Sequence, residues 1–245
     1  MAKKLSFFSA GKLLITSEYG VIDGALALAL PTKLGQTMTV VQHDKAEIHW
    51  IAKDADGQIW FEDQFKITDF SPKNSMGETA LRLQQLFLLI RKMNPQFMSP
   101  EKGVMIETQL NFNRDWGLGS SSTLINNVAQ WAGVNAYQLQ SKIFGGSGYD
   151  IACAQKRSPI TYQLVAHKPL VNEVVFKPGF HQNLHFIYIN KKQNSRTAIN
   201  EHYRGITDEK RNSLDAITKM LLEAKRAVSY THLRAHETGR KLVCR

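Results

Sequence analysis

The sequence predicts an α+β fold, in which strands and helices occur in blocks rather than in regular alternation. Three observations predict it. β-forming residues dominate residues 5–67, apolar residues recur at helical spacing through the middle of the chain, and strand-like segments return near residue 160. With 245 residues, the chain is long enough to bury one large core or two smaller ones.

The N-terminal block is expected to form two pairs of strands. Strand-like residues run over 5–41 around a turn at 17–24, and Pro31 is expected to end the second strand because proline has no backbone N–H. The next two strands, 48–51 and 58–67, flank an Asp-Ala-Asp-Gly turn and are expected to form a hairpin.

The middle of the chain is expected to be mainly helical. Leu81, Leu86 and Leu89 lie on one face of a helix predicted over 79–93, which stops before Asn94-Pro95. Alternating apolar residues predict a strand over 104–110. The other expected elements are helices over 120–131, 137–144, 195–203, 208–228 and from Gly148 through Ala154, and strands over 160–164 and 184–189.

A glycine- and serine-rich loop joins the strand over 104–110 to the helix that follows it. It reads Gly117-Leu118-Gly119-Ser120-Ser121-Ser122. Glycines let a backbone approach phosphate oxygens closely, and the free N–H groups of a helix start favour an anion. No Lys follows as in a Walker A loop, and Ser122 replaces the third glycine of a dinucleotide motif. The pattern suits a phosphate-binding loop, or a turn that only caps a helix.

A second glycine-rich loop precedes Asp150. It reads Gly145-Gly146-Ser147-Gly148-Tyr149-Asp150 and opens another expected helix. A carboxylate in the first turn of a helix stays ionised, and it can accept a proton from a substrate hydroxyl. The alternative is that Asp150 only favours the helix start.

A third feature, Gly11-Lys12, follows the first expected strand. A lysine there could neutralise charge on a transferred phosphoryl group, and Glu18-Tyr19 in the next turn could hold a substrate hydroxyl or orient Lys12. The alternatives are an ordinary surface lysine and an ordinary turn carboxylate.

Taken in order, the three features resemble the GHMP kinases, the superfamily that includes galactokinase, homoserine kinase, mevalonate kinase and phosphomevalonate kinase. Residues 9–19 resemble its first motif, residues 117–122 its phosphate-binding motif, and residues 147–150 the loop that carries its catalytic aspartate. The resemblance extends over about 5–200.

The resemblance implies a role for each residue that matches a motif. Lys12 and Asp150 would be the catalytic pair, Ser121 would bind Mg²⁺, and the cofactors would be ATP and Mg²⁺. The loop that would bind the ATP phosphates comprises Gly117, Leu118, Gly119, Ser120, Ser121 and Ser122. The residues that would contact the acceptor are Glu18, Tyr19, Ser147 and Gly148.

Finer features favour one branch of the superfamily. Lys12, where galactokinases have arginine, and Tyr19 resemble the mevalonate and phosphomevalonate kinases, and residues 145–152 resemble the subgroup with a Gly-Tyr-Asp-Ile-Ala signature. Three departures stand against the pattern. Ser17 occupies a usual glycine position and Asn113 a frequent proline position, and residues 138–140 lack the upstream glutamate of mevalonate kinases.

By resemblance, the fold comprises two α+β domains with ATP and acceptor between them. Residues 1–180 would form an ATP-binding domain like domain 2 of ribosomal protein S5, and residues 181–228 the start of a ferredoxin-like domain. Residues 229–245 resemble a translated sequencing adaptor and are expected to be non-native, and the family's third glycine-rich motif is absent. We therefore expect a C-terminally truncated and inactive copy of the enzyme.

Composition limits the partners. The N-terminal residues lack the uninterrupted apolar core of a signal peptide, and no run of about eighteen apolar residues occurs, so a cytoplasmic protein without a membrane partner is expected. The net charge is +10, but no basic run interleaved with aromatics is present, so an anionic small molecule is favoured over nucleic acid. Two alternatives remain: an RNA-binding module with the S5-like fold, and a non-catalytic regulator. The sequence does not indicate the oligomeric state.

Overall fold

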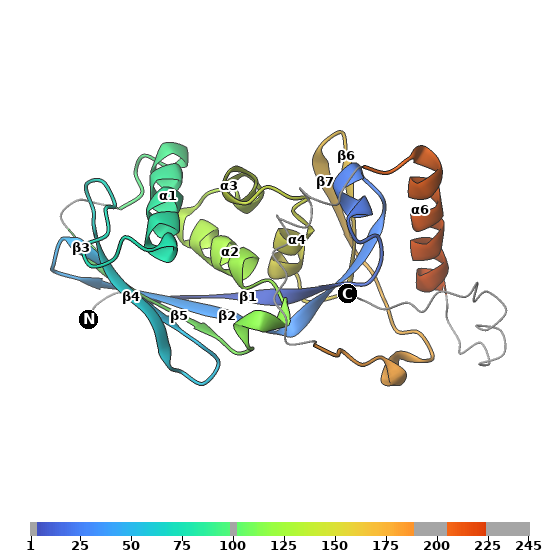
Figure 1. The fold of residues 1–245 in the computed structure, drawn as a ribbon, viewed down its shortest axis with the longest axis horizontal. Helices are drawn as coiled ribbons and strands as arrows, with labels where there is room; N and C mark the ends of the chain where they lie inside the picture. Colours follow the sequence, from blue (N-terminus) through green and yellow to red (C-terminus); the bar gives the residue numbers. More distant parts are fainter. Residues whose placement is uncertain (1–3, 99–101, 189–204, 224–245) are drawn as a thin grey trace.

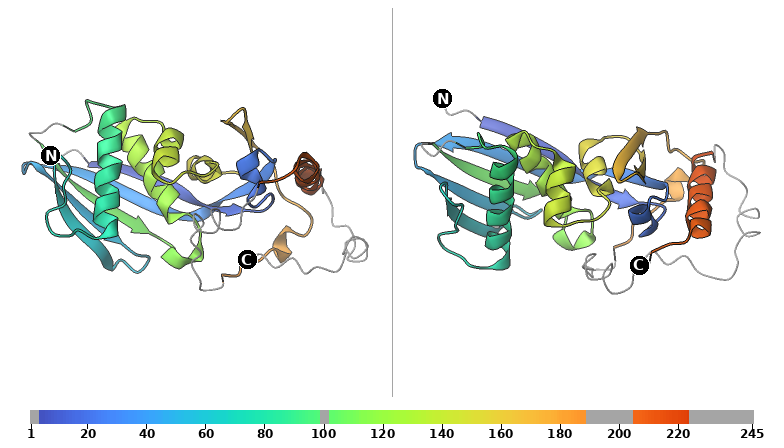
Figure 2. Two further views of the ribbon diagram at one scale, coloured as in Figure 1. Left: turned by 45° about the horizontal axis from the view of Figure 1, so that its top comes forward. Right: turned by 90° about the horizontal axis from the view of Figure 1, so that it is seen from above.

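A computed structural model of the chain describes residues 4–98, 102–188 and 205–223. A seven-stranded sheet carries helices α1 (Glu78–Met93), α2 (Ser120–Ala132), α3 (Ala136–Ile143) and α4 (Tyr149–Gln155) on one face (Figure 1). Figure 2 shows that these helices are spread across the sheet, with α1 at one end and α4 toward the other. The predicted α+β class is confirmed. No helix in the described part is long and apolar enough to cross a membrane.

The sheet is built around the long strand β2. The strands are β1 (Lys4–Leu14), β2 (Ala27–His43), β3 (Glu47–Lys53), β4 (Ile59–Lys66), β5 (Gly103–Leu110), β6 (Ile160–Val165) and β7 (Lys168–Glu173). Their order is β4-β3-β5-β2-β6-β7, and β1 pairs with β2. The β3–β5 pair is parallel and the other pairs are antiparallel. Because β1 follows one edge of β2, while β5 and β6 share the other, β2 connects both ends of the sheet.

The prediction that Pro31 ends a strand is wrong, because β2 continues through it to His43. Pro31 pairs with Lys12 at the point where the register between β1 and β2 shifts, between Ala10 and Lys12. The ladder is already irregular at such a bulge, so a residue without a backbone N–H is tolerated there.

The C-terminal predictions have mixed outcomes. Helix α6 (Asp208–Glu223) confirms the described part of the helix expected over 208–228. The strand expected over 184–189 is wrong for 184–188, which have no regular structure. The expected helix over 195–203 and the tail 229–245 lie outside the described residues. Strand β7 was missed because its segment, Lys-Pro-Leu-Val-Asn-Glu, carries a proline and charged ends and lies exposed at the edge of the sheet.

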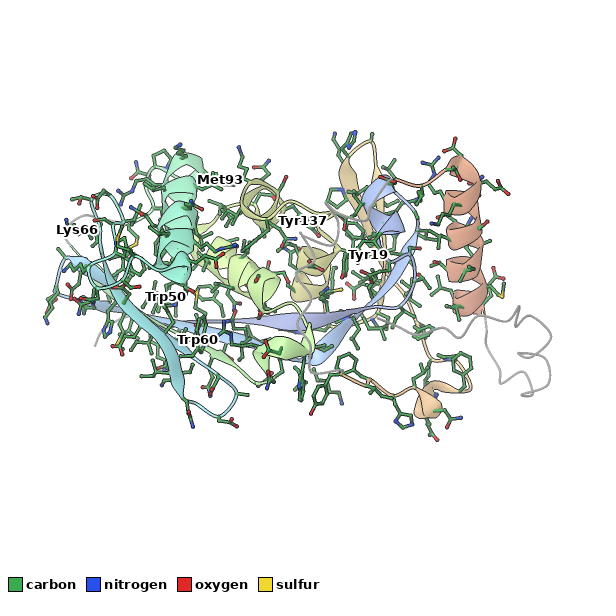
Figure 3. The ribbon with its side chains drawn as sticks, in the orientation of Figure 1. Tyr19, Trp50, Trp60, Lys66, Met93 and Tyr137 are labelled. Carbon is green, nitrogen blue, oxygen red and sulfur yellow. The ribbon has the colours of Figure 1, made fainter. Side chains whose placement is uncertain are left out.

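The largest core cluster lies between the sheet and the helices on its face, and α1 contributes a large share of it (Figure 3). Phe87 on α1 contacts the rings of Trp50 and Phe65 edge-on, with centroids 5.9 and 5.8 Å apart. All three side chains are buried, and each contributes roughly 1.5–3 kcal/mol to stability. The apolar face predicted for α1 is only partly right. Leu86 is buried and Leu89 packs against the cluster, but Leu81 is only partly buried. The buried face of α1 consists of Ala80, Leu83, Leu86, Phe87 and Ile90.

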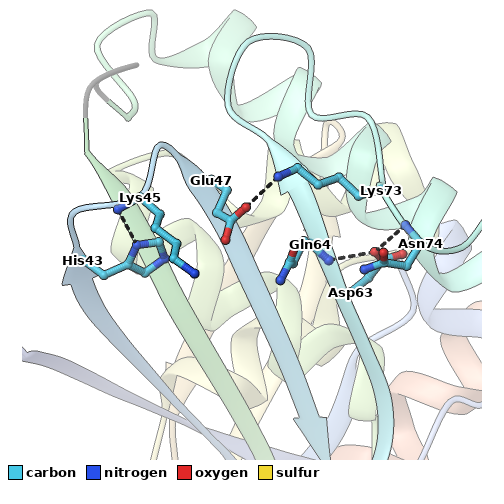
Figure 4. A network of polar contacts seen from close by, with 7 residues as sticks. All are labelled: His43, Lys45, Glu47, Asp63, Gln64, Lys73 and Asn74. Carbon is cyan, nitrogen blue, oxygen red and sulfur yellow. Dashed lines mark hydrogen bonds and ion pairs between the residues drawn. The ribbon is translucent and has the colours of Figure 1, made fainter.

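A buried carboxylate organises the connection from β4 to α1 (Figure 4). Asp63 is 1% exposed, and it accepts hydrogen bonds from the backbone N–H groups of Gln64, Asn74 and Ser75 at 2.7, 3.0 and 3.1 Å. Because these donors satisfy its oxygens, the burial of Asp63 fixes the loop instead of destabilising it.

Helix α6 packs against the N-terminal end of β2. The buried Thr218 donates to Leu26 O at 2.9 Å, and Leu26 N donates to Asp215 at 2.6 Å. Thr218 also lies 2.7 Å from the hydroxyl of Thr16. Residues assigned to a second domain therefore contact the first, and the proposed boundary at residue 180 stays a prediction.

Candidate active site

The glycine- and serine-rich loop forms a sharp entry into α2. Gly117 and Gly119 have φ angles of 74° and 86°, and Gly119 is the N-cap residue of the helix. The first hydrogen bond of the helix runs from Thr123 N to Gly119 O, 3.0 Å apart. The N–H groups of the three serines before Thr123 therefore have no carbonyl partner within α2, and this helix start favours an anion.

The loop residues differ in what their side chains do. Leu118 is buried with Leu110 and Phe112, so its side chain anchors the loop. Ser122 is also buried, and its hydroxyl donates to Gly119 O at 2.9 Å. Ser120 is partly exposed and Ser121 is exposed, so Ser121 is the serine whose hydroxyl is most accessible to a ligand.

Strand β1 brings Lys12 directly against this loop. Lys12 N donates to Leu118 O at 3.0 Å. A Cβ on Gly11 would lie 2.9 Å from Leu118 O, and a Cβ on Gly119 would lie 3.0 Å from Lys12 Cγ. Both glycines are therefore needed for the strand, the lysine side chain and the loop to lie this close.

Lys12 reaches the start of α4, more than one hundred residues along the chain. Its Nζ lies 3.3 Å from Asp150 Oδ1 and donates to Tyr149 Oη at 2.5 Å. Burial alone would lower the pKa of Lys12, but the neighbouring Asp150 and Tyr149 raise it above its usual range. The ammonium form is therefore held at neutral pH. The side chains of Lys12 and Asp150 are 19% and 29% exposed, so both remain accessible to a ligand.

Asp150 has an oxygen whose bonding capacity is unused. Its Oδ1 is covered by protein atoms and makes the ion pair with Lys12, but the angles of this contact are not those of a hydrogen bond. Because Oδ1 itself is covered, an acceptor hydroxyl can reach only the exposed part of the side chain, and a carboxylate held by an ion pair can accept a proton there.

Two tyrosines, Tyr162 and Tyr137, contact the second glycine-rich loop and fix its position. Tyr162 donates its hydroxyl hydrogen bond to Ser147 O, and Gly148, at φ 88°, is the N-cap residue of α4. A Cβ on Gly148 would lie 3.0 Å from the ring of Tyr137. Ser147 Oγ accepts from Tyr149 N at 3.5 Å. The structure therefore places Ser147 and Gly148 beside the catalytic candidates, where they set the direction of α4.

The turn after β1 places Glu18 near the same charges. Desolvation by the surrounding protein raises the pKa of Glu18 above its usual range, while Lys12 lowers it and Asp150 raises it. Ser17 and Tyr19 have φ angles of 64° and 60°, which explains why glycine suits position 17. Ser17 Oγ donates to Leu26 O at 2.7 Å and so holds the turn. Tyr19 precedes the short helix η1 (Gly20–Asp23) and lies in this half of the molecule (Figure 3).

Sequence reasoning missed a buried polar network that joins the elements of the site. Ser9 of β1 donates to Asn127 Oδ1 at 2.7 Å and accepts from Asn126 Nδ2 at 2.8 Å. Gln155 of α4 donates to Asn126 at 3.0 Å, and Asn127 donates to Gln36 O at 2.9 Å. Two consecutive asparagines inside a helix were the available signal, because asparagine has a low helix propensity.

The donor set for a metal is small. The described residues contain no group of three His, Cys, Asp or Glu side chains that could enclose an ion. Mg²⁺ usually keeps several waters and binds through one or two protein oxygens together with substrate phosphates. The exposed hydroxyl of Ser121 and the Asp150 carboxylate fit that kind of site, and do not fit a site built from protein ligands alone.

Comparisons with known proteins show the fold. No family model matches the sequence, and no match was found among curated proteins. Methanococcus jannaschii mevalonate kinase is similar with a TM-score of 0.63 and 17% identity, covering 90% of this chain and 73% of that one. Streptococcus pneumoniae phosphomevalonate kinase, in complex with phosphomevalonate and AMPPNP, is similar with a TM-score of 0.62 and 15% identity. The match covers 90% of this chain and 74% of that one.

A D-glycero-D-manno-heptose 1-phosphate kinase from Bacteroides thetaiotaomicron is also similar, with a TM-score of 0.55 and 19% identity over 71% of this chain. The chain spans 61% of that kinase, and 60% of a similar protein from Campylobacter jejuni. The predicted GHMP kinase fold is confirmed by these likenesses.

Proposed function

We propose that the protein is an ATP-dependent kinase that phosphorylates a hydroxyl group of a small metabolite. The observation that carries the proposal is the convergence of Lys12, the loop 117–122 and Asp150 at one place. Each feature alone has a simpler explanation. The loop could only cap a helix, Lys12 could be a surface lysine, and Asp150 could only favour a helix start. Their direct contact is what phosphoryl transfer requires, because that chemistry depends on positioning and charge neutralisation.

The proposed reaction assigns one task to each group. The N–H groups at the start of α2 bind ATP phosphate oxygens, and Lys12 Nζ stabilises the charge on the transferred phosphoryl group. Asp150 accepts the proton of the acceptor hydroxyl. The acceptor oxygen then bonds to the γ-phosphorus, the bond from that phosphorus to the bridging oxygen breaks, and ADP leaves. Mg²⁺, held with the help of Ser121, would supply neutralising charge when bound.

The proposed acceptor is mevalonate or phosphomevalonate. Lys12 and Tyr19 match that branch of the family, and two of the similar structures are a mevalonate kinase and a phosphomevalonate kinase. Glu18 is proposed to contact an acceptor hydroxyl, which its electrostatic interaction with both Lys12 and Asp150 supports. ATP as the phosphoryl donor is supported by the AMPPNP bound in the phosphomevalonate kinase.

Two measurements test the proposal. The first is binding of ATP with Mg²⁺ to the 245-residue chain by calorimetry. The second is ADP formation by the product of the gene's full reading frame, with mevalonate, phosphomevalonate, homoserine and sugars as acceptors. We expect nucleotide binding, and ADP formation that requires one of the first two acceptors. Turnover with only a sugar or homoserine would support the kinase function but show that the proposed acceptor is wrong.

Two other outcomes would contradict the proposed kinase function and favour an alternative. RNA binding that weakens steeply with salt, without ATP binding, would favour the RNA-binding module. Equal ATP binding by the wild type and Asp150→Asn, with turnover by neither, would favour a non-catalytic regulator.

A further inference from the structure

Tyr149 lies between two residues of the proposed catalytic machinery, but no part of the mechanism above uses it. It is the first residue of α4, directly after Gly148 and before Asp150. Its ring packs on a buried cluster that includes Val21, Ala152 and Tyr162. The ring is therefore held by the core while its hydroxyl reaches the site.

The hydrogen-bonding capacity of Lys12 explains what this hydroxyl can do. An ammonium has three N–H donors and no acceptor. One donor is directed to Tyr149 Oη at 2.5 Å, and Asp150 Oδ1 lies 3.3 Å from the same nitrogen. Since both partners belong to the first turn of α4, the position of this helix determines where Nζ lies. A remaining donor can reach a phosphoryl oxygen.

The aromatic ring adds a second constraint. Lys12 Nζ lies 4.8 Å from the centroid of the Tyr149 ring, within the range of a cation–π contact. On the other side, the lysine stem passes Gly119, where even a Cβ would lie 3.0 Å from Lys12 Cγ. A flexible side chain is thus confined between the phosphate loop and Tyr149.

We propose that Tyr149 is a positioning residue, whose hydroxyl accepts a hydrogen bond from Lys12 Nζ and holds this ammonium between Asp150 and the phosphate loop. The kinetic consequence rests on the proposed kinase function, but the contact itself does not. Removing the hydroxyl removes one of the contacts that fix the lysine side chain, and the carboxylates of Asp150 and Glu18 then attract it without that constraint. The amine then also becomes more accessible to a reagent, because the hydroxyl 2.5 Å from it is gone.

The first experiment measures the contact without any enzyme assay. The 245-residue chain is treated with acetic anhydride, which reacts with neutral amines, and acetylation of each lysine is followed by mass spectrometry. In the wild type, Lys12 should react more slowly than Lys156, which is paired with Glu173 at the surface. In Tyr149→Phe, acetylation of Lys12 should be at least about threefold faster while that of Lys156 is unchanged, because one hydrogen bond that restrains Nζ is lost.

A matched control comes from the same region. Tyr137→Phe removes the hydroxyl of a second tyrosine that packs on Gly148, and this hydroxyl has no hydrogen bond in the described part of the chain. It should leave the reactivity of Lys12 unchanged. Equal acetylation of Lys12 in the wild type and Tyr149→Phe, or fast acetylation of Lys12 in the wild type, would overturn the proposal. The wild-type comparison holds even if Tyr149→Phe does not fold.

The second experiment measures turnover by the full reading-frame product. Tyr149→Phe should lower kcat about tenfold and change KM for ATP less than about threefold, because the ammonium stabilises charge in the transition state more than it binds the ground state. An unchanged kcat in an active enzyme would overturn the positioning role. If Lys12 reactivity responds but no acceptor is phosphorylated, the kinase proposal fails and the contact stands.

Discussion

A carboxylate with at least one buried oxygen lies near each end of the sheet, and the two differ in their partners. One accepts backbone hydrogen bonds and the other makes an ion pair. Asp63, at the end near α1, accepts three backbone hydrogen bonds and is almost completely buried. Figure 4 shows those from Gln64 and Asn74. Asp150, at the start of α4, has an oxygen with an ion pair and no hydrogen bond, and its side chain is 29% exposed.

The difference separates a structural carboxylate from a reactive one. Every hydrogen bond that Asp63 accepts stabilises a loop, and its burial keeps a ligand from the carboxylate. Asp150 is held by charge, with part of its bonding capacity unused, which is what a proton acceptor needs.

Asp150→Asn should abolish turnover while leaving the fold intact. An amide cannot accept the proton of the acceptor hydroxyl at neutral pH, so kcat of the full reading-frame product should fall at least about 10³-fold. The free energy of unfolding should fall by about 1–2 kcal/mol, since Lys12 loses the charge that offsets its burial, although the pair is partly screened by solvent. Steady-state kinetics and urea denaturation check both parts. A large loss of stability with full activity would reverse the roles of the two carboxylates.

Asp63→Ala should show the opposite behaviour. Truncation leaves the N–H groups of Gln64, Asn74 and Ser75 without their acceptor, so the free energy of unfolding should fall by about 2–3 kcal/mol. Urea denaturation of the 245-residue chain measures this. ATP affinity of the folded fraction should be unchanged, because α1 and β4 lie at the other end of the sheet (Figure 1).

Two glycines of the phosphate loop offer a matched pair. Gly117→Ala and Gly119→Ala both place a side chain at positive φ, which costs roughly 1 kcal/mol. A Cβ at 117 meets nothing within 4 Å, whereas one at 119 lies 2.8 Å from Ser122 Oγ and 3.0 Å from Lys12 Cγ. Calorimetry should therefore show weaker ATP binding for Gly119→Ala than for Gly117→Ala. Equal affinities would mean that the contact between the loop and Lys12 is unimportant for the nucleotide.

Glu18→Gln should have the smallest effect. The folded protein raises the pKa of Glu18, so the ionised carboxylate costs stability once the pH rises above its unfolded value near 4.3. The variant should be more stable at pH 7 by less than about 0.5 kcal/mol, because the exposed side chain is screened by solvent. The gain should disappear below about pH 4, where both forms are neutral. Thermal melting of both proteins across this pH range measures the stability difference. A gain in stability that grows as the pH falls would contradict the prediction.

The sequence predicted the features whose causes are local. Helical spacing predicted α1, and glycine patterns predicted the loops before α2 and α4, because the conformation at Gly119 and Gly148 depends mainly on those residues themselves. The direct contact of Lys12 with Asp150 was expected only through a family resemblance, since no local rule links residues 138 positions apart.

The errors arose where distant partners decide the structure. Pro31 is accommodated by a bulge in the pairing with β1, and β7 forms only because β6 offers it an edge. The network around Ser9 and Asn126 requires three elements to be in place before its hydrogen bonds exist. The contact between Tyr149 and Lys12 joins residues far apart in the sequence, so it follows only from the fold.

The central claim is that Lys12, the phosphate loop and Asp150 form one site for ATP. The most direct measurement is acetylation of Lys12 in the 245-residue chain with and without ATP and Mg²⁺, with Lys156 as the internal reference. The account predicts that the nucleotide slows acetylation of Lys12 at least about tenfold and leaves Lys156 unchanged. Equal acetylation of Lys12 at a nucleotide concentration that saturates binding would contradict it.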